Sequence, residues 1–454
     1  MRENMIDRQR LREDFDKVLK VLENVPTIDK TKRIGREEFA LRRKKIYEAI
    51  HAHGVEVGLV FSDEHYCGDV PYLCGNCNIS VEQVGGVVGP TGMHLVAGLE
   101  GGYAAEQLVR RNGIFVHKAE LLQLADEKYP VAAERFEDIL IAANNGVMPD
   151  KIALLTPRQV IPSALVEYCN SIFGEENVVD LQEEYFKVKY EKSVDEVELV
   201  RNASVVTDAV IRSMLAVLKP GMLETQVAAW GYFAAKELGA EEIGFDFMVT
   251  ANEANRSIIG KALNRVIQPG DWVHVGAGTK QDGLNACVRR SVIATDANTG
   301  VTPEQKYWFD MVEGAYDVGY REFCRVAAEK LPAYLQEKAL VDYFAARSDE
   351  VSARIGRRIA LENLKPYTGT HNSGYTECQE FYGAITLDTK NPLGNRIITM
   401  LDVALRGIGN KWDEVIIPGF DYLVIENTLC KDGARVETLT KLPINVQHLV
   451  GNAD

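Results

Sequence analysis

A sixteen-residue stretch, 366–381, gathers the side-chain types that carry out acid–base and metal chemistry. It contains one imidazole, one thiol and two carboxylates, from His371, Glu377, Cys378 and Glu380. Imidazoles and carboxylates can transfer protons, and a thiol beside an imidazole can act as a nucleophile. Glycines and other small residues between them allow the backbone to approach a ligand closely. The alternative is a polar surface loop, and partners elsewhere in the chain would decide between the two.

Length and composition indicate a two-domain protein of ordinary globular composition. The 454 residues exceed the size at which single cores stop growing, so we expect domains of about 150 to 250 residues. A net charge of −15 argues against nucleic acid as a partner, because phosphate binding needs an excess of clustered Lys and Arg. We expect no signal peptide and no membrane span, because no apolar run of sufficient length is present.

The eight cysteines are scattered along the chain, which is typical of reduced thiols in a cytoplasmic protein. Cys74 and Cys77 form a CxxC pair that, together with Cys67, could bind a metal or cycle between thiol and disulfide. No second CxxC and no histidine pair lies nearby in the sequence to complete a metal site. The pair therefore has no assigned role.

The pattern of apolar residues divides the chain into three parts. Residues 1–34 have helical spacing and form an arm that we expect to pack on the first domain or on a neighbouring subunit. In residues 35–185, short strands alternate with helices, which predicts a small α/β domain. From residue 186 onward, two helices followed by strands occur twice, which predicts an α+β domain with two related halves. Ser193 is the expected N-cap of its first long helix.

This order of elements, with the residues at their joints, resembles the superfamily of creatinase, aminopeptidase P, prolidase and methionine aminopeptidase (M24). Four motifs carry the resemblance: the helix start at 189–198, the Pro-Gly turn at 218–224, the strand at 247–255 and the Gly-Asp strand entry at 267–273. They fall in the order of the superfamily, and the likeness covers about residues 35–445. It implies an α/β N-terminal domain and a pita-bread domain with pseudo-two-fold halves.

The resemblance also implies positions for metal ligands, and several of them are changed. In the metalloenzymes of this superfamily, Asp, Asp, His, Glu and Glu hold two metal ions. These positions fall on Gly276, Cys287, His371, Asp402 and Glu426, and two further histidines of the superfamily fall on Ile259 and Cys378. Since Gly276 has no side chain to offer, we expect the two-metal centre to be lost.

A one-metal site is the first interpretation of what remains. The resemblance leaves one thiol, one imidazole and two carboxylates around one ion, a plausible tetrahedral zinc set formed by Cys287, His371, Asp402 and Glu426. In the alternative, Cys287 is a small core residue, the carboxylates are held by hydrogen bonds and no metal binds, as in creatinase itself.

Other residues could take part in chemistry or substrate binding. The acid–base candidates are His371, Glu377, Glu380 and Glu426, and the candidate nucleophiles are Cys287 and Cys378. Arg289 and Arg290 point to opposite faces of one strand, so one of them could bind a substrate carboxylate while the other forms an ion pair. His274 shares a face with Gly276. Tyr72 lies in a turn that, in dimeric relatives, reaches the active site of the other subunit.

These observations favour a hydrolase or lyase of a small polar substrate in a creatinase-like pocket rather than a dinuclear metallopeptidase. One alternative is an Xaa-Pro aminopeptidase or dipeptidase with an altered single-metal site. The other is a non-catalytic binding or scaffold protein with the same fold. We expect a cytoplasmic homodimer that holds one divalent metal ion, most plausibly zinc, or none.

Overall fold

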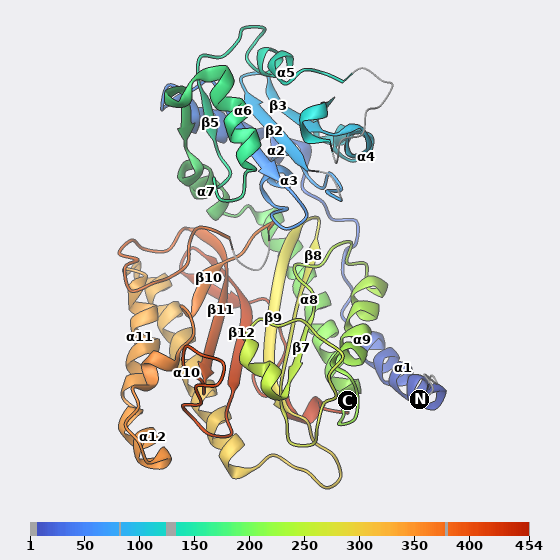
Figure 1. Ribbon diagram of the computed structural model, residues 1–454, viewed down its shortest axis with the longest axis vertical. Helices are drawn as coiled ribbons and strands as arrows, with labels where there is room; N and C mark the ends of the chain where they lie inside the picture. Colours follow the sequence, from blue (N-terminus) through green and yellow to red (C-terminus); the bar gives the residue numbers. More distant parts are fainter. Residues whose placement is uncertain (1–6, 81–82, 124–132, 377–379, 454) are drawn as a thin grey trace.

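The computed structural model describes residues 7–80, 83–123, 133–376 and 380–453, which form two β-sheets with their covering helices (Figure 1). The first sheet has six strands in the order β4-β3-β2-β1-β5-β6. The second has seven, in the order β10-β11-β12-β9-β8-β7, with β13 paired to β12. Within the described ranges, no helix is both long and apolar enough to cross a membrane.

The first sheet is the core of the predicted α/β domain. Its strands are β1 (Val57–Ser62), β2 (Val84–Gly89), β3 (Gly92–Ala97), β4 (Phe115–Lys118), β5 (Ile152–Leu154) and β6 (Val178–Asp180). Its helices are α2 (Arg36–His51), α3 (Asp69–Cys74), α4 (Leu99–Val109), α5 (Phe136–Ala143), α6 (Ser163–Phe173) and α7 (Gln182–Tyr190). Every residue of β1 is buried, because apolar clusters cover both faces of the sheet.

The second sheet confirms the pita-bread expectation. Its strands are β7 (Met248–Ala251), β8 (Trp272–Gln281), β9 (Leu284–Ile293), β10 (Thr370–Asn372), β11 (Arg396–Arg406), β12 (Tyr422–Asp432) and β13 (Arg435–Thr438). Helices α8 (Val194–Val217) and α9 (Glu224–Glu237) accompany β7 to β9, whereas α10 (Pro303–Glu329), α11 (Tyr334–Ala345) and α12 (Ser348–Ile355) accompany β10 to β12 (Figure 1). Each half thus consists of helices followed by strands, as the sequence pattern predicts.

The link between the two domains lies slightly later than predicted. The expected boundary at residue 186 falls inside α7, and the break between α7 and α8 spans residues 191–193. Ser193 is the N-cap of α8, since its hydroxyl accepts a hydrogen bond from the Glu196 backbone N–H at 3.1 Å. The Glu196 carboxylate accepts one from the Ser193 backbone N–H at 2.7 Å, which completes a capping box.

The N-terminal arm packs on the second domain, so the expectation that it lies on the first domain was wrong. Helix α1 (Arg8–Glu23) contacts α8 and α9 (Figure 1). The Phe15 ring lies 6.5 Å from the Trp230 ring and 6.1 Å from the Phe233 ring, and Val18 is part of the α8 core cluster. The spacing of apolar residues predicts a helix with one apolar face, but it does not say which surface covers that face.

Candidate functional site

One row of residues crosses the second sheet and contains most of the predicted ligand positions. Asp402 on β11 is paired with Glu426 on β12, and Glu426 with Arg289 on β9. Arg289 is paired in turn with Gly276 on β8. Directly paired residues point to the same face of a sheet, so these positions converge although 126 residues separate Gly276 from Asp402 in the sequence.

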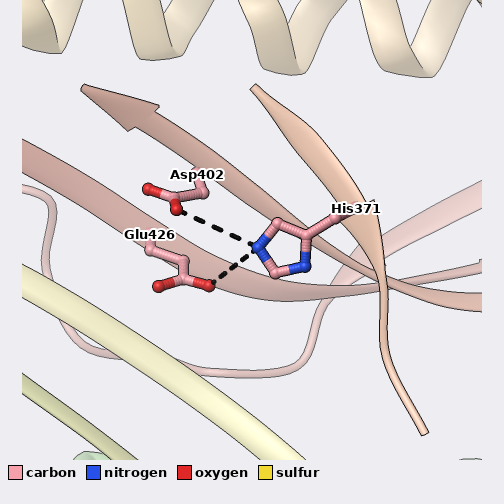
Figure 2. A group of neighbouring side chains, drawn as sticks. All are labelled: His371, Asp402 and Glu426. Carbon is pink, nitrogen blue, oxygen red and sulfur yellow. Dashed lines mark ion pairs between the residues drawn. The ribbon is translucent and has the colours of Figure 1, made fainter. Parts of the chain in front are cut away.

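His371 joins this row from the edge strand β10. It is paired with Met400, two residues before Asp402, and therefore shares the face of Asp402. Figure 2 shows its Nε2 directed at both carboxylates, 3.5 Å from Glu426 Oε1 and 3.9 Å from Asp402 Oδ2. The exposed fractions of the three side chains are 8% for His371, 4% for Asp402 and 0% for Glu426. These three residues form a His–carboxylate cluster, and the imidazole is its most accessible member.

The donor atoms of the His–carboxylate cluster lie close enough to hold one metal ion. One ligand atom from each residue lies within 4.8 Å of the other two. Cys287, the predicted fourth ligand, is fully buried, and its Sγ donates a hydrogen bond of 3.4 Å to Oε2 of Glu426, the oxygen not directed at His371. The structure therefore brings three of the four predicted ligands together and places the thiol behind one of them.

The guanidinium of Arg289 lies at the centre of the site. Its Nη1 donates to Asp402 Oδ2 at 3.0 Å and to the Tyr367 hydroxyl at 3.2 Å. Its Nη2 donates to the Ile258 carbonyl and to the Tyr422 hydroxyl, both at 2.7 Å. Its Nε donates to a ring nitrogen of His274 at 3.1 Å and lies 3.7 Å from Glu426 Oε2. Since a guanidinium has five N–H groups, these five hydrogen bonds use all of them.

Gly276 provides the space for this side chain. A Cβ atom at position 276 would lie 3.1 Å from Arg289 Cγ, 3.3 Å from His274 Nε2 and 3.3 Å from Met248 Sδ. Contacts this short force neighbouring atoms to move, and an aspartate would be larger still. The missing side chain at 276 and the arginine at 289 therefore fit together sterically.

Burial and charge set the protonation of the site. Burial, together with the charge of Glu426, raises the pKa of Asp402 to about 6 although Arg289 and His371 oppose the rise. Burial also favours the protonated form of Glu426, but the hydrogen bond from His371 and the charge of Arg289 outweigh it and lower the pKa of Glu426. Burial and the charge of Arg289 hold the pKa of His274 well below its usual range, so His274 is a neutral acceptor for Arg289.

Comparisons with known proteins agree with this architecture. The profile of metallopeptidase family M24 matches residues 198–329. Among solved structures, X-Pro aminopeptidase from Thermotoga maritima MSB8 superimposes with a TM-score of 0.67 at 17% identity, covering 89% of this chain and 98% of that one. Prolidase from Pyrococcus horikoshii OT3 gives a TM-score of 0.66 at 15% identity, covering 89% of this chain and 99% of that one. Residues 198–329 thus match metallopeptidase family M24, and the chain shares its fold with these two proteins.

Sequence similarity to individual superfamily members is local. An uncharacterized peptidase, YqhT, from Bacillus subtilis is 26% identical over 123 residues, which cover 27% of this chain and 35% of that protein. Xaa-Pro dipeptidase from Pyrococcus furiosus is 24% identical over 107 residues, which cover 24% of this chain and 31% of that protein. The chain thus matches about a third of the length of these curated relatives.

The two-metal centre of the superfamily's metalloenzymes does not fit these residues. Gly276 offers no ligand, and Nη1 of Arg289 already donates to Asp402 Oδ2, an oxygen that a metal would need. A zinc ion about 2.1 Å from this oxygen would lie within about 5 Å of Nη1. At that distance a dication and a guanidinium repel each other by about 7 kcal/mol at an effective dielectric constant of ~20. Even a single metal ion must therefore compete with Arg289.

Glu380, a predicted acid–base residue, is held by hydrogen bonds and an ion pair. Its Oε1 accepts hydrogen bonds from the backbone N–H groups of Tyr375 at 2.8 Å and Thr376 at 3.2 Å. Its Oε2 lies 3.0 Å from Nζ of Lys189, which also contacts Asp69 at 2.6 Å. This carboxylate thus stabilises the turn after β10 and the junction between the domains. Glu377 and Cys378 lie outside the described residues.

The two arginines and Tyr72, which are predicted to bind substrate, contact other residues of their own chain. Arg290 binds the backbone carbonyls of Glu426, Leu442 and Pro443 at 2.7 to 3.0 Å, so it is a structural residue. Arg289 has no N–H group left for a substrate carboxylate. Tyr72 is only 3% exposed within its own chain, where its ring packs against Tyr185 and Tyr375, so it is not available to a partner's site.

Sequence reasoning placed His274 near Gly276 correctly but missed two residues of the site. Tyr367 and Tyr422 donate to or accept from each other at 2.6 Å, and both contact Arg289. The sequence signal that could have pointed to this part of the site is the pair formed by Gly276 and Arg289. Strand pairing places an arginine beside the position that lacks its expected ligand, and a buried arginine needs hydrogen-bond acceptors around it. Cys74 and Cys77 of the CxxC pair are buried free thiols. Within the described residues, the one group of three metal-type ligands that converges is formed by His371, Asp402 and Glu426.

Proposed function

We propose that this superfamily member is a hydrolase of a small polar substrate, acting on a C–N or similar bond with His371 as the proton-transfer group. The observation that supports this proposal is the imidazole Nε2, 3.5 Å from the buried carboxylate of Glu426, in the sheet that carries the ligands of the superfamily's metalloenzymes. A neutral imidazole that donates its Nε2–H to a carboxylate carries its lone pair on Nδ1 and is held in one orientation. In the neutral form of His371, Nδ1, which is buried within the chain, would be the atom that accepts a proton from a bound substrate.

Activity towards a panel of small C–N compounds tests the proposal. The panel contains ureas, amidines, N-acyl amino acids and the dipeptides Ala-Pro and Gly-Pro, with products measured by mass spectrometry. We expect turnover of at least one non-prolyl compound, and a decrease of about 10²- to 10⁴-fold in kcat for His371→Gln. His448→Gln, at an exposed position near the C-terminus, is the matched control and should retain activity. Folded protein that turns over no panel compound would favour the non-catalytic binding alternative.

A second candidate is an Xaa-Pro aminopeptidase or dipeptidase with one metal ion. The convergence of ligand atoms from His371, Asp402 and Glu426 within 4.8 Å favours it, and zinc suits these donor types. It predicts one equivalent of metal in protein purified without chelators, and prolyl dipeptide hydrolysis that a chelator abolishes. Metal-free protein that retains its activity would exclude this candidate.

The assembly and location of the protein are proposals from the superfamily resemblance. We infer a homodimer in the cytoplasm that receives a small-molecule substrate. Light scattering coupled to size-exclusion chromatography would test the dimer, since a mass near 50 kDa identifies a monomer. Limited proteolysis would test the proposed division at residues 34 and 186, with cleavage expected at 191–193 rather than inside α7.

A further inference from the structure

We infer that Arg289 is a built-in cation that replaces the superfamily's metal ions, and that glycine at 276 is the partner change that makes this replacement possible. The inference concerns metal binding and stability, so it does not depend on whether the proposed hydrolase activity is correct.

The charge of Arg289 lies beside both carboxylates of the site. The guanidinium lies 3.0 Å from Asp402 and 3.7 Å from Glu426, the two residues at the superfamily's glutamate ligand positions. Both carboxylates are at least 96% buried, and buried carboxylates need a nearby positive charge. Arg289 reaches both carboxylates from β9, which is paired with the strand of Glu426 and lies one strand further from Asp402.

The side chain of Arg289 is held in place from several directions. Its five hydrogen-bond acceptors come from β8, β11, β12, the segment before β10 and the carbonyl of Ile258. Ile258 has φ = 65°, a left-handed conformation that a β-branched residue rarely adopts. An arginine that occupied this space by chance would not use all five N–H groups on acceptors from five segments. The surroundings are therefore shaped for a guanidinium.

The position of the Arg289 side chain depends sterically on Gly276. A Cβ atom there would lie 3.1 Å from Arg289 Cγ, so a side chain at 276 would require this arginine, held by its hydrogen bonds, to shift by a few tenths of an ångström. Glycine at position 276 removes a metal ligand, and arginine at position 289 supplies a cation. Together they convert a metal-dependent arrangement into one that needs no metal.

Titration with Mn²⁺ tests the inference, because Mn²⁺ prefers carboxylates and imidazole and binds the free thiols of this chain weakly. We expect isothermal titration calorimetry to show no saturable Mn²⁺ binding to the wild type, whose unfolding midpoint is unchanged by EDTA. Arg289→Gln should bind Mn²⁺ at least tenfold more tightly than the wild type, with a lower unfolding midpoint that Mn²⁺ partly restores. Gly276→Asp combined with Arg289→Ala should bind more tightly again.

Two further variants keep the test decisive. Arg289→Lys retains the charge while losing most of the hydrogen bonds, so it should still exclude Mn²⁺, even if Arg289→Gln does not fold. His371→Ala in the Arg289→Gln background should abolish the new Mn²⁺ binding. Wild-type protein that binds Mn²⁺ as tightly as Arg289→Gln would overturn the inference, whatever its activity. Wild-type protein that excludes Mn²⁺ but hydrolyses no substrate would leave the inference intact and remove only the proposed function.

Discussion

Replacing Lys189 with methionine tests how the two domains are joined behind the site. Lys189 on α7 lies 2.6 Å from Asp69 on α3 and 3.0 Å from Glu380, which stabilises the turn after β10. The exposed fractions of these side chains are 4%, 0% and 3%. Methionine keeps most of the length of the side chain but removes the ammonium. Two buried carboxylates then lose the charge that they share.

The expected loss follows from burial. Removing one partner from a buried ion pair costs about 3–5 kcal/mol of folding free energy, because the remaining charge is left uncompensated. Lys187→Met is the matched control, since Lys187 is on the same helix, is 45% exposed and pairs with Glu183 and Glu184 at the surface. An exposed pair contributes about 0–1 kcal/mol. The difference between the two variants should therefore be about 3 kcal/mol.

The pH dependence of the difference has a definite sign. Burial favours protonated Glu380, but the charges of Lys189 and Lys192 outweigh it and lower the pKa of Glu380 in the wild type. Without Lys189 the folded-state pKa of Glu380 rises above its unfolded value, and that of Asp69, which burial already raises, rises further. The folded variant then binds an additional proton at mildly acidic pH, so its stability increases from pH 7.5 to pH 5.5 relative to the wild type.

Urea unfolding at both pH values, followed by tryptophan fluorescence and far-UV circular dichroism, measures these free energies where the two signals coincide. The structural argument would be refuted if Lys189→Met were destabilised no more than Lys187→Met. A large loss that did not change between pH 7.5 and pH 5.5 would also contradict it, because packing alone would then explain the effect.

Three further predictions concern stability. Burial and a neighbouring histidine lower the pKa of His94 to about 4, whereas the pKa of an unfolded histidine is about 6.5. Because the unfolded chain binds a proton at His94 more readily than the folded chain, the unfolding temperature should fall between pH 6.5 and pH 4. The fall should be less steep in His94→Gln. Gly407→Ala places a Cβ atom 1.8 Å from the Phe420 carbonyl oxygen and should lower the urea midpoint by the equivalent of about 1–3 kcal/mol, whereas Gly300→Ala, with no atom within 4 Å, should not. Phe15→Ala should cost about 1 kcal/mol in urea unfolding rather than the ~3–5 kcal/mol of a buried ring, because Phe15 is 42% exposed; a full core-type loss would show that α1 is more deeply packed in solution.

The sequence by itself determined the fold class and the positions of the site. Strand alternation, helix spacing and the ordered motifs predicted both domains, and the aligned ligand positions do converge on one face of the second sheet. These features are local or follow a fixed order along the chain. Alternation with a period of two also placed Arg289 and Arg290 on opposite faces.

Only the tertiary structure decided what each side chain does. The role of Arg289 depends on hydrogen-bond acceptors from five segments, including Ile258 and Asp402. The carboxylate of Glu380 forms an ion pair with Lys189, which lies 191 residues earlier in the sequence. The spacing of apolar residues in α1 likewise does not show that this helix covers α8 and α9. Local periodicity determines which face of an element a residue occupies. Hydrogen bonds and ion pairs depend instead on the register and packing of segments that are distant in the sequence. These long-range contacts decide whether a residue at the site can bind a metal ion or takes the place of one.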